Sequence, residues 1–154
     1  MTFLLDVNVL IALNVLIALI DPAHVAHDDA HVWFADMSRH AWATCPITEN
    51  GVLRILGNPK YPNSPGSPAQ VAGILRSLRA LPGHEFWSED FSVVADAQVD
   101  AARILTSAQV TDTYLLALAQ RRGGQLATFD RRLSTEAVAK GKSALCLIAT
   151  ATRG

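Results

Sequence analysis

Four acidic residues occupy remote segments of the chain, each where an α/β protein gathers its functional groups. Asp6 directly follows the apolar run Phe3–Leu5, and Asp130 follows a second run that reads as a strand. Glu49 and Asp112 each come directly after a threonine, in the first turn of an expected helix. In an open α/β sheet, the carboxyl ends of the strands and the amino ends of the helices share the edge where ligands bind. We therefore expect the four carboxylates to converge at that edge.

A cluster of this kind predicts a site for a hard divalent cation. Ionised carboxylates repel one another unless a counter-charge is present, and oxygen ligands suit Mg²⁺ or Mn²⁺. Such metals activate water and stabilise charge on a phosphate, which suits phosphodiester hydrolysis. Taken singly, Glu49 and Asp112 are also ordinary first-turn acids favoured by the helix dipole, and Asp130 is a candidate cap for a following helix. Asp6 lies in an apolar segment and must be paired, solvated or bound to a metal.

Three histidines form a rival candidate for a metal site. His24, His27 and His31 fall on one stripe of an expected helix, and the spacing of His27 and His31 suits Zn²⁺. The alternative is a solvated helix face, because no cysteine follows at ligand spacing.

The elements that must position the acids alternate between strand and helix. The expected strands are Phe3–Leu5, Trp42–Cys45, Glu85–Trp87, Gln125–Phe129 and Leu145–Ile148. Seven helices are expected. The first follows the first strand and ends at Asp21, and the second runs from about 22 to Met37. The others are a helix capped by Thr48 that ends at Leu56, a helix that begins at Pro68 and ends before Pro82, and helices over 96–106, Thr111–Arg122 and 131–139. Strands separated by helices imply a mainly parallel sheet covered on both faces. The pattern predicts a single α/β sandwich domain over residues 1–154.

The composition fits one compact domain and excludes several classes of protein. Half of the 154 residues are hydrophobic and 18% are charged, which excludes disorder. The net charge of −1 argues against a protein that coats nucleic acid through bulk positive charge. Two cysteines are too few for a disulfide framework and favour the cytoplasm. The start of the chain lacks a basic region typical of a signal peptide, and the longest apolar stretch, 9–20, is too short to cross a membrane.

The segments that carry the four acids resemble the motifs of a known family. FLLDVNVL resembles the opening strand of a PIN-domain ribonuclease, and ITENGVLRIL resembles its glutamate-bearing helix. VTDTYLLALA resembles the central aspartate helix, and LATFDRRL the final acidic strand end. The four motifs in this order, between about residues 2 and 149, are similar to a VapC-type toxin of a bacterial toxin–antitoxin pair.

This resemblance implies a PIN-like three-layer α/β/α sandwich that cleaves RNA endonucleolytically with Mg²⁺ or Mn²⁺, forms a homodimer and is inhibited by a cognate antitoxin. The implied catalytic and metal-binding residues are Asp6, Glu49, Asp112 and Asp130, with Asn8 and Thr128 as polar supports. We expect Asp6 and Asp112 to hold one metal, while Glu49 and Asp130 complete its shell or a second site. The candidate contacts to RNA phosphates are Arg121, Arg122, Arg131 and Arg132. The alternative for these arginines is a helix end or a solvated surface.

One feature departs from the family pattern. The hexapeptide NVLIAL at 8–13 is followed at once by an identical copy at 14–19, where the family has room for one. Six helical residues turn by about 600°, so an extra copy moves whatever follows to a different helix face. If the second copy took the strand-end register, Ala12 would replace Asp6 at the site. We expect the first register to be kept, with a first helix longer than is usual in the family.

Two functions of other classes remain open on the sequence alone. A phosphatase of the haloacid dehalogenase kind also places an aspartate after its first strand, but it needs a second aspartate two residues later, where this chain has Asn8. A catalytically impaired PIN fold that only binds RNA or an antitoxin is the other alternative.

Overall fold

The computed structural model describes residues 1–8, 10–37 and 41–151, and within them five strands form one parallel sheet. The strands are β1 (Thr2–Leu5), β2 (Ala41–Thr44), β3 (His84–Phe86), β4 (Gln125–Thr128) and β5 (Leu145–Leu147), in the order β3-β2-β1-β4-β5. β1 is central, and Leu4 lies opposite Ala43 of β2 and Leu126 of β4. The sheet order reverses direction at β1, which is where such sheets place ligands.

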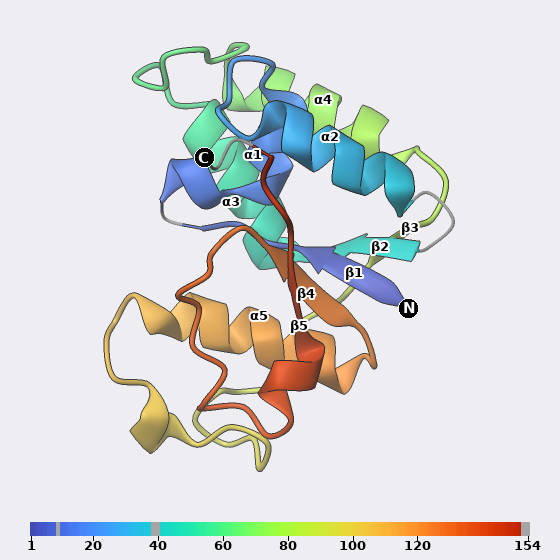
Figure 1. Ribbon diagram of the computed structural model, residues 1–154. Helices are drawn as coiled ribbons and strands as arrows, with labels where there is room; N and C mark the ends of the chain where they lie inside the picture. The colour runs from blue at the N-terminus through green and yellow to red at the C-terminus, as the bar shows by residue number, and fades with distance from the viewer. Residues whose placement is uncertain (9, 38–40, 152–154) are drawn as a thin grey trace.

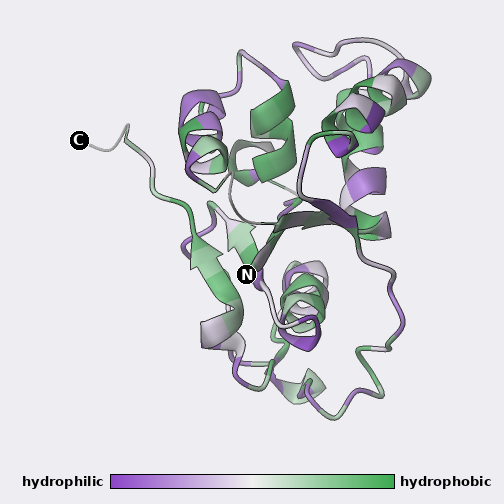
Figure 2. Cartoon of the chain, turned by 90° about the vertical axis from the view of Figure 1, so that its right-hand side faces the viewer, coloured by the Kyte–Doolittle hydropathy of each residue, from purple (hydrophilic) through white to green (hydrophobic). Residues whose placement is uncertain are grey.

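Helices cover both faces of this sheet, as Figure 1 and the side view in Figure 2 show. On one face lie α1 (Val15–Ile20), α2 (His27–Asp36), α3 (Pro46–Leu56) and α4 (Pro68–Arg79), and on the other lies α5 (Gln109–Arg121). Short 3₁₀ turns occupy η1 (Ile11–Leu13), η2 (Ala101–Arg103) and η3 (Gly141–Ala144). The predicted three-layer α/β/α sandwich is therefore confirmed.

The residues of β1 alternate between the two hydrophobic cores. Phe3 and Leu5 pack with α1 and α3, whereas Leu4 packs with α5. This alternation follows from the two-residue period of a strand. It also means that Asp6, directly after Leu5, continues on the side of Leu4 and α5.

The start of α3 differs in detail from the prediction. Thr48 was expected to cap the helix, but Cys45 is the cap residue and Pro46 occupies the first helical position. Thr48 lies in the third position, where its hydroxyl accepts a hydrogen bond from the backbone N–H of Cys45 at 2.9 Å. Proline suits the first helical position because its fixed φ is already helical and it needs no hydrogen-bond partner there. Glu49 remains in the first turn, as expected.

The helix predicted from about 22 to Met37 is shorter than expected. It begins at His27, and Val25 and Val32, although large and apolar, are 72% and 71% exposed. The helix instead buries Ala30, with Trp33 and Phe34 packed against the core.

The helices predicted over 96–106 and 131–139 are wrong, because these two segments pair with each other. Val99 and Val138 form an antiparallel bridge, the N–H of Asp100 donates to the Ala137 carbonyl, and that of Ala139 donates to Gln98. Only η2 remains helical in the first segment. Backbone groups that bond across to a distant segment are not free to form a helix.

The duplicated hexapeptide is accommodated by a loop and not by a longer helix, so that prediction is also wrong. α1 has six residues and comes from the second copy, where the side chain of Asn14 accepts a hydrogen bond from the N–H of Ile17 at 3.0 Å. The N–H of Val15 donates to the carbonyl of Asp6 at 3.2 Å. The strand therefore keeps the first register and the helix uses the second copy. We call residues 8–13 the insertion loop; of these, Asn8 and residues 10–13 are described, and they lie between the strand and the helix.

No helix within the described ranges is both long and apolar enough to cross a membrane.

Candidate active site

Asp6 is fully buried at the carboxyl end of β1, the central strand. Thr128, at the end of β4, donates a hydrogen bond from its hydroxyl to Asp6 Oδ2 at 2.7 Å. Asp6 Oδ1 is also buried but has no hydrogen-bond partner among the described residues. Burial raises the pKa of Asp6 to about 7, against the hydrogen bond from Thr128, and the charges of Asp112 and Asp130 add to the rise.

Asp112 and Asp130 reach this strand end from two other elements. Asp112 lies in the first turn of α5, and its pKa is raised to about 6 by burial and by the charge of Asp130. Asp130 follows β4, where its N–H donates to Thr128 and its carboxylate accepts a hydrogen bond from Asn8 Nδ2 at 3.3 Å. The structure thus brings three of the four predicted acids into electrostatic contact, with Thr128 and Asn8 beside them.

Glu49 is held elsewhere. Its Oε2 accepts a hydrogen bond from the Thr44 hydroxyl at 2.6 Å and lies 3.5 Å from Nε of Arg79. Ala43 and Cys45 pack on the α5 side of the sheet, so Thr44 between them faces the opposite layer. The carboxylate of Glu49 is therefore drawn toward α4, and the pairing with Arg79 was not foreseen from the sequence.

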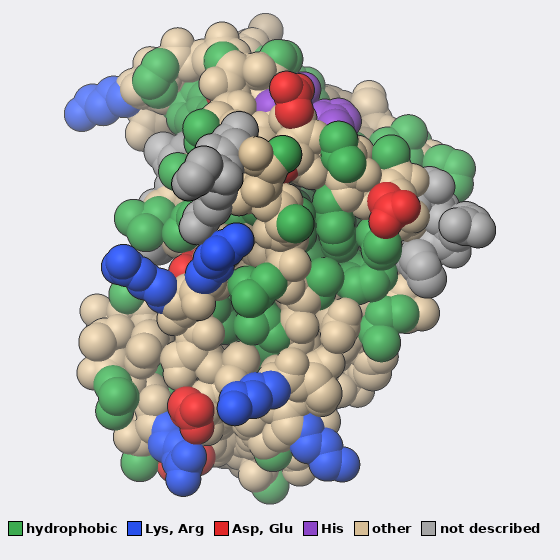
Figure 3. Space-filling model, viewed as in Figure 1, with side chains coloured by type: hydrophobic (Ala, Val, Ile, Leu, Met, Phe, Trp, Pro, Cys, Tyr) green, Lys and Arg blue, Asp and Glu red, His purple; other side chains and the backbone are tan. Residues whose placement is uncertain are grey.

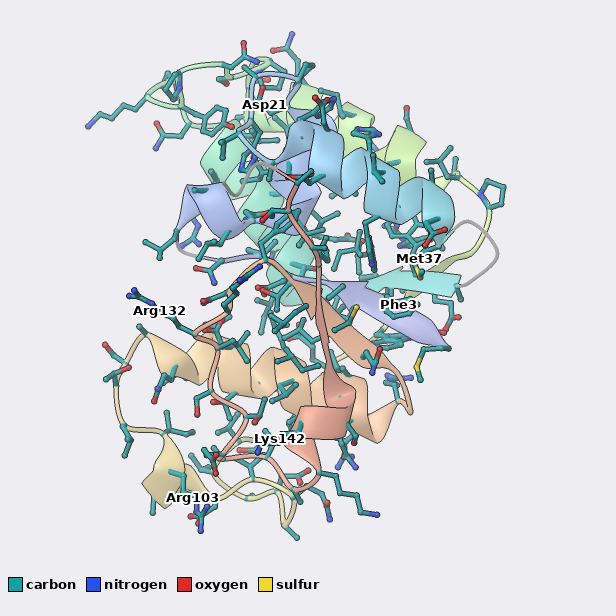
Figure 4. All side chains as sticks on the ribbon, in the orientation of Figure 1. Phe3, Asp21, Met37, Arg103, Arg132 and Lys142 are labelled. Carbon is teal, nitrogen blue, oxygen red and sulfur yellow. The ribbon has the colours of Figure 1, made fainter. Side chains whose placement is uncertain are left out.

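The predicted RNA-contacting arginines fall into two groups. Arg121 pairs with Asp96 at 2.6 Å, and Arg122 donates to the Ser88 carbonyl at 2.9 Å. Both lie at the end of α5 opposite Asp112, about 14 Å away along the helix axis. Arg131 and Arg132 instead lie beside the acids, and Figure 4 shows Arg132 near the amino end of α5.

A cavity of about 490 Å³ opens over the acidic cluster. Its lining comprises Leu10, Leu13, Ala108, Gln109, Asp112, Phe129, Asp130, Arg131 and Arg132. Leu10, Leu13 and Gln109 were not among the predicted site residues. The duplication was a signal for the first two, since they belong to its first copy.

The donor set at this end of the sheet fits a hard divalent cation. It offers carboxylate oxygens, and Asp6 Oδ1 is a buried acceptor that no described donor satisfies. Burial is the main cause of the raised pKa values of Asp6 and Asp112, and the neighbouring carboxylates add to it, so a bound cation would favour the ionised forms. No group of three or more His, Cys, Asp or Glu in the described ranges is already set at metal-binding spacing, so a cation would have to draw the carboxylates together.

The histidine stripe serves a structural purpose in α2. His27 Nδ1 lies 2.7 Å from the Ala18 carbonyl oxygen, and His31 Nε2 lies 2.8 Å from that of Leu19. These are carbonyls of the last turn of α1, which lack helical partners. The two imidazoles therefore fasten α2 to α1, and the structure gives no support to the rival zinc site.

The fold and the strand-end acids together define the class of this protein. A model of the PIN domain family matches residues 3–139, and the chain belongs to that family. The chain is also 42% identical over 139 residues to Ribonuclease VapC39 of Mycobacterium tuberculosis, covering 90% of this chain and 96% of that protein. Ribonuclease VapC44 of the same organism is 40% identical over 129 residues, which cover 84% of this chain and 90% of that protein. Ribonuclease VapC38 of the same organism is 40% identical over 139 residues, which cover 90% of this chain and 96% of that protein. Within the PIN family, the chain is a member of the VapC-type ribonuclease toxins, and the resemblance inferred from the four motifs is confirmed.

Proposed function

We propose that this protein is a Mg²⁺- or Mn²⁺-dependent endoribonuclease and the toxin of a toxin–antitoxin pair. The observation that carries the proposal is the convergence of Asp6, Asp112 and Asp130 at one strand end, with a buried carboxylate oxygen of Asp6 left unpaired. A bound cation would lower the pKa of a water molecule and stabilise charge on the scissile phosphate. The relatives named above are ribonucleases, which supports RNA as the substrate.

Each residue of the cluster has a separate task in this proposal. Asp6 and Asp112 are the proposed metal ligands, and Asp130 completes the shell and orients the attacking water. Thr128 fixes the carboxylate of Asp6 through its hydrogen bond, and Asn8 does the same for Asp130. Both hydrogen bonds restrict the orientation of an acid, so fewer side-chain conformations are lost when a cation and RNA bind.

The arginines and Glu49 complete the proposal. Arg131 and Arg132 are placed to pair with RNA phosphates over the cavity, whereas Arg121 is already paired with Asp96 and Arg122 with Ser88. Glu49 is a proposed fourth acid that acts only after it leaves Arg79.

A cognate antitoxin is the proposed protein partner, and a homodimer the proposed assembly. An apolar hollow of about 200 Å³ between α2 and the sheet, lined in part by Phe3, Trp33, Met37 and Trp42, offers a surface for an apolar partner segment. Figure 3 shows hydrophobic side chains gathered toward the right of the view, where Figure 1 places α2 and the neighbouring strands. We place the protein in the cytoplasm, the compartment that its free cysteines favour.

The test is cleavage of total RNA by protein freed of antitoxin, with Mn²⁺ and with mapping of the new ends. Wild type should cut, whereas Asp6→Asn and Asp112→Asn should each lose at least about 100-fold in rate, because each removes a proposed ligand charge. Asp36→Asn changes an exposed aspartate of α2 and is the matched control, which should cut like wild type. Equal cutting by wild type and Asp6→Asn would refute the assignment.

A second candidate is a PIN fold that binds RNA or its antitoxin without cleavage. The pairing of Glu49 with Arg79 and the insertion loop favour it, since both depart from the expected site. Metal binding by wild type without RNA cleavage would select this alternative. The family match leaves no support for the phosphatase reading.

A further inference from the structure

The insertion loop is a separable addition to an otherwise complete connection between β1 and α1. The N–H of Val15 donates to the carbonyl of Asp6 across the loop at 3.2 Å. If residues 8–13 were removed, Asp6, Val7, Asn14 and Val15 would become consecutive, and the same bond would close a four-residue turn from the first to the fourth residue. The two ends of the loop are therefore already close enough for a tight turn to join them.

The loop lies at the acidic cluster. Asn8 Nδ2 donates to Asp130 at 3.3 Å, and Asn8 Oδ1 accepts from the N–H of Leu10 at 2.9 Å, which fixes the start of the loop. The N–H of Leu13 donates to the Leu10 carbonyl at 2.9 Å and closes a tight turn. Leu10 is 60% exposed, although it is a large apolar residue.

Leu10 and Leu13 form one wall of the cavity whose other walls carry Asp112, Asp130, Arg131 and Arg132. The cavity thus has an apolar side from the loop and a charged side from the segment after β4. An unpaired nucleotide has the same two sides, since its base presents apolar faces and its phosphate is anionic. The volume of about 490 Å³ falls among pockets that hold small molecules, about 300–1,000 Å³.

We propose that the insertion loop is a specificity wall: the base of an unpaired nucleotide of the RNA packs against Leu10 and Leu13, while its phosphate lies between the acidic cluster and Arg131 and Arg132. The inference rests on the proposed ribonuclease function and deepens it. Because the wall comes from the extra copy of NVLIAL, it distinguishes this chain from a family member with a single copy. The loop then selects where single-stranded RNA is cut, and the acids perform the cleavage.

The experiment compares wild type with Leu10→Ser and with a variant that lacks residues 8–13. Leu147→Ser is the matched control, because Leu147 is also a half-exposed leucine, at 50%, and does not line the cavity. Two readouts are needed: the affinity for a short single-stranded RNA with non-hydrolysable linkages in the presence of Mn²⁺, and the map of cleavage ends in total RNA with Mn²⁺.

Leu10→Ser should weaken binding about three- to tenfold, because it removes an apolar contact with the base, and the deletion should change which positions are cut. Leu147→Ser should match wild type in both readouts. Unchanged affinity in Leu10→Ser together with an unchanged cleavage map in the deletion variant would overturn the proposal. Faster cutting at the same positions by the deletion variant would also overturn it, because the loop would then only restrict access to the site. If no protein cuts RNA but Leu10→Ser still binds it more weakly, the ribonuclease assignment fails while the apolar wall stands.

Discussion

Replacement of Asp6 by asparagine should raise the free energy of unfolding of the metal-free protein at alkaline pH relative to its effect in acid. Burial and two neighbouring acids raise the pKa of Asp6 from 3.8 to about 7. Below pH 4 the carboxyl group is protonated in both the folded and the unfolded chain. Between pH 4 and 7 the folded chain holds a proton that the unfolded chain has released, so this group lowers the free energy of unfolding as the pH rises.

The size of the effect follows from the shift. About three pKa units at about 1.4 kcal/mol each correspond to about 4 kcal/mol, fully expressed above pH 7. The asparagine amide can still accept the hydrogen bond from Thr128. Its N–H₂ group would lie where Oδ1 is unpaired, at a cost of about 1–3 kcal/mol that does not vary with pH. The change in the effect of Asp6→Asn between two pH values therefore reports the charge of the Asp6 carboxylate alone.

The assay is urea unfolding of wild type and Asp6→Asn at pH 4.5 and 8.5, in a chelating buffer. The free energy of unfolding of Asp6→Asn relative to wild type should be higher at pH 8.5 than at pH 4.5 by about 3 kcal/mol, because about 1 kcal/mol of the effect is already present at pH 4.5. Asp36→Asn, an exposed substitution on α2, should show no such change. Mg²⁺ should stabilise wild type at pH 8.5 and leave Asp6→Asn unaffected, because a ligand stabilises only the state that binds it. A stabilisation by asparagine that is equal at both pH values would refute the reasoning.

Two further predictions concern the connection between β1 and α1 and its packing. Asn14→Ala should lower the free energy of unfolding in urea by about 1 kcal/mol, because it removes the N-cap of α1. Asn8→Ala should lower it less, because Asn8 caps no described α-helix. Equal losses would contradict the assignment of α1 to the second copy. Gly51→Ala should lower the melting temperature, since a Cβ there would lie 2.5 Å from Val7 Cγ1 and cost about 1–3 kcal/mol. Gly73→Ala should raise the melting temperature, because the nearest atom to a Cβ there would be Arg76 Nη1 at 3.9 Å, an ordinary contact, and alanine favours the helix. A rise for both variants would show that the Val7 side chain moves aside at little cost.

The sequence by itself determined the order of the strands and helices and the places of the acids. Apolar runs, caps and turn residues act within a few positions, so β1 before Asp6 and α5 around Asp112 follow from local signals. The family motifs could be recognised for the same reason. Local signals failed where distant segments compete, as for Val99 and Val138, whose pairing prevents two helices that each segment favours alone.

Only the tertiary structure decided which copy of NVLIAL forms the helix. The two copies are identical, so no local preference separates them. The second copy buries Asn14 and Val15 and joins the carbonyl of Asp6, while the first copy places Leu10 at the surface. The core has room for one copy beside β1, and the other is left as a loop at the cavity.

The direction of Glu49 was likewise decided in three dimensions. Its place in the first turn of α3 could be predicted, but its carboxylate is held by Arg79, thirty residues later, and by Thr44 on the neighbouring strand. A side chain with several rotatable bonds takes the orientation in which its charge is paired, and the partner is brought near only by the packing of α4 on α3. The sequence therefore determined where the acids stand along the chain, and the tertiary structure determined that three of them meet while the fourth is drawn away.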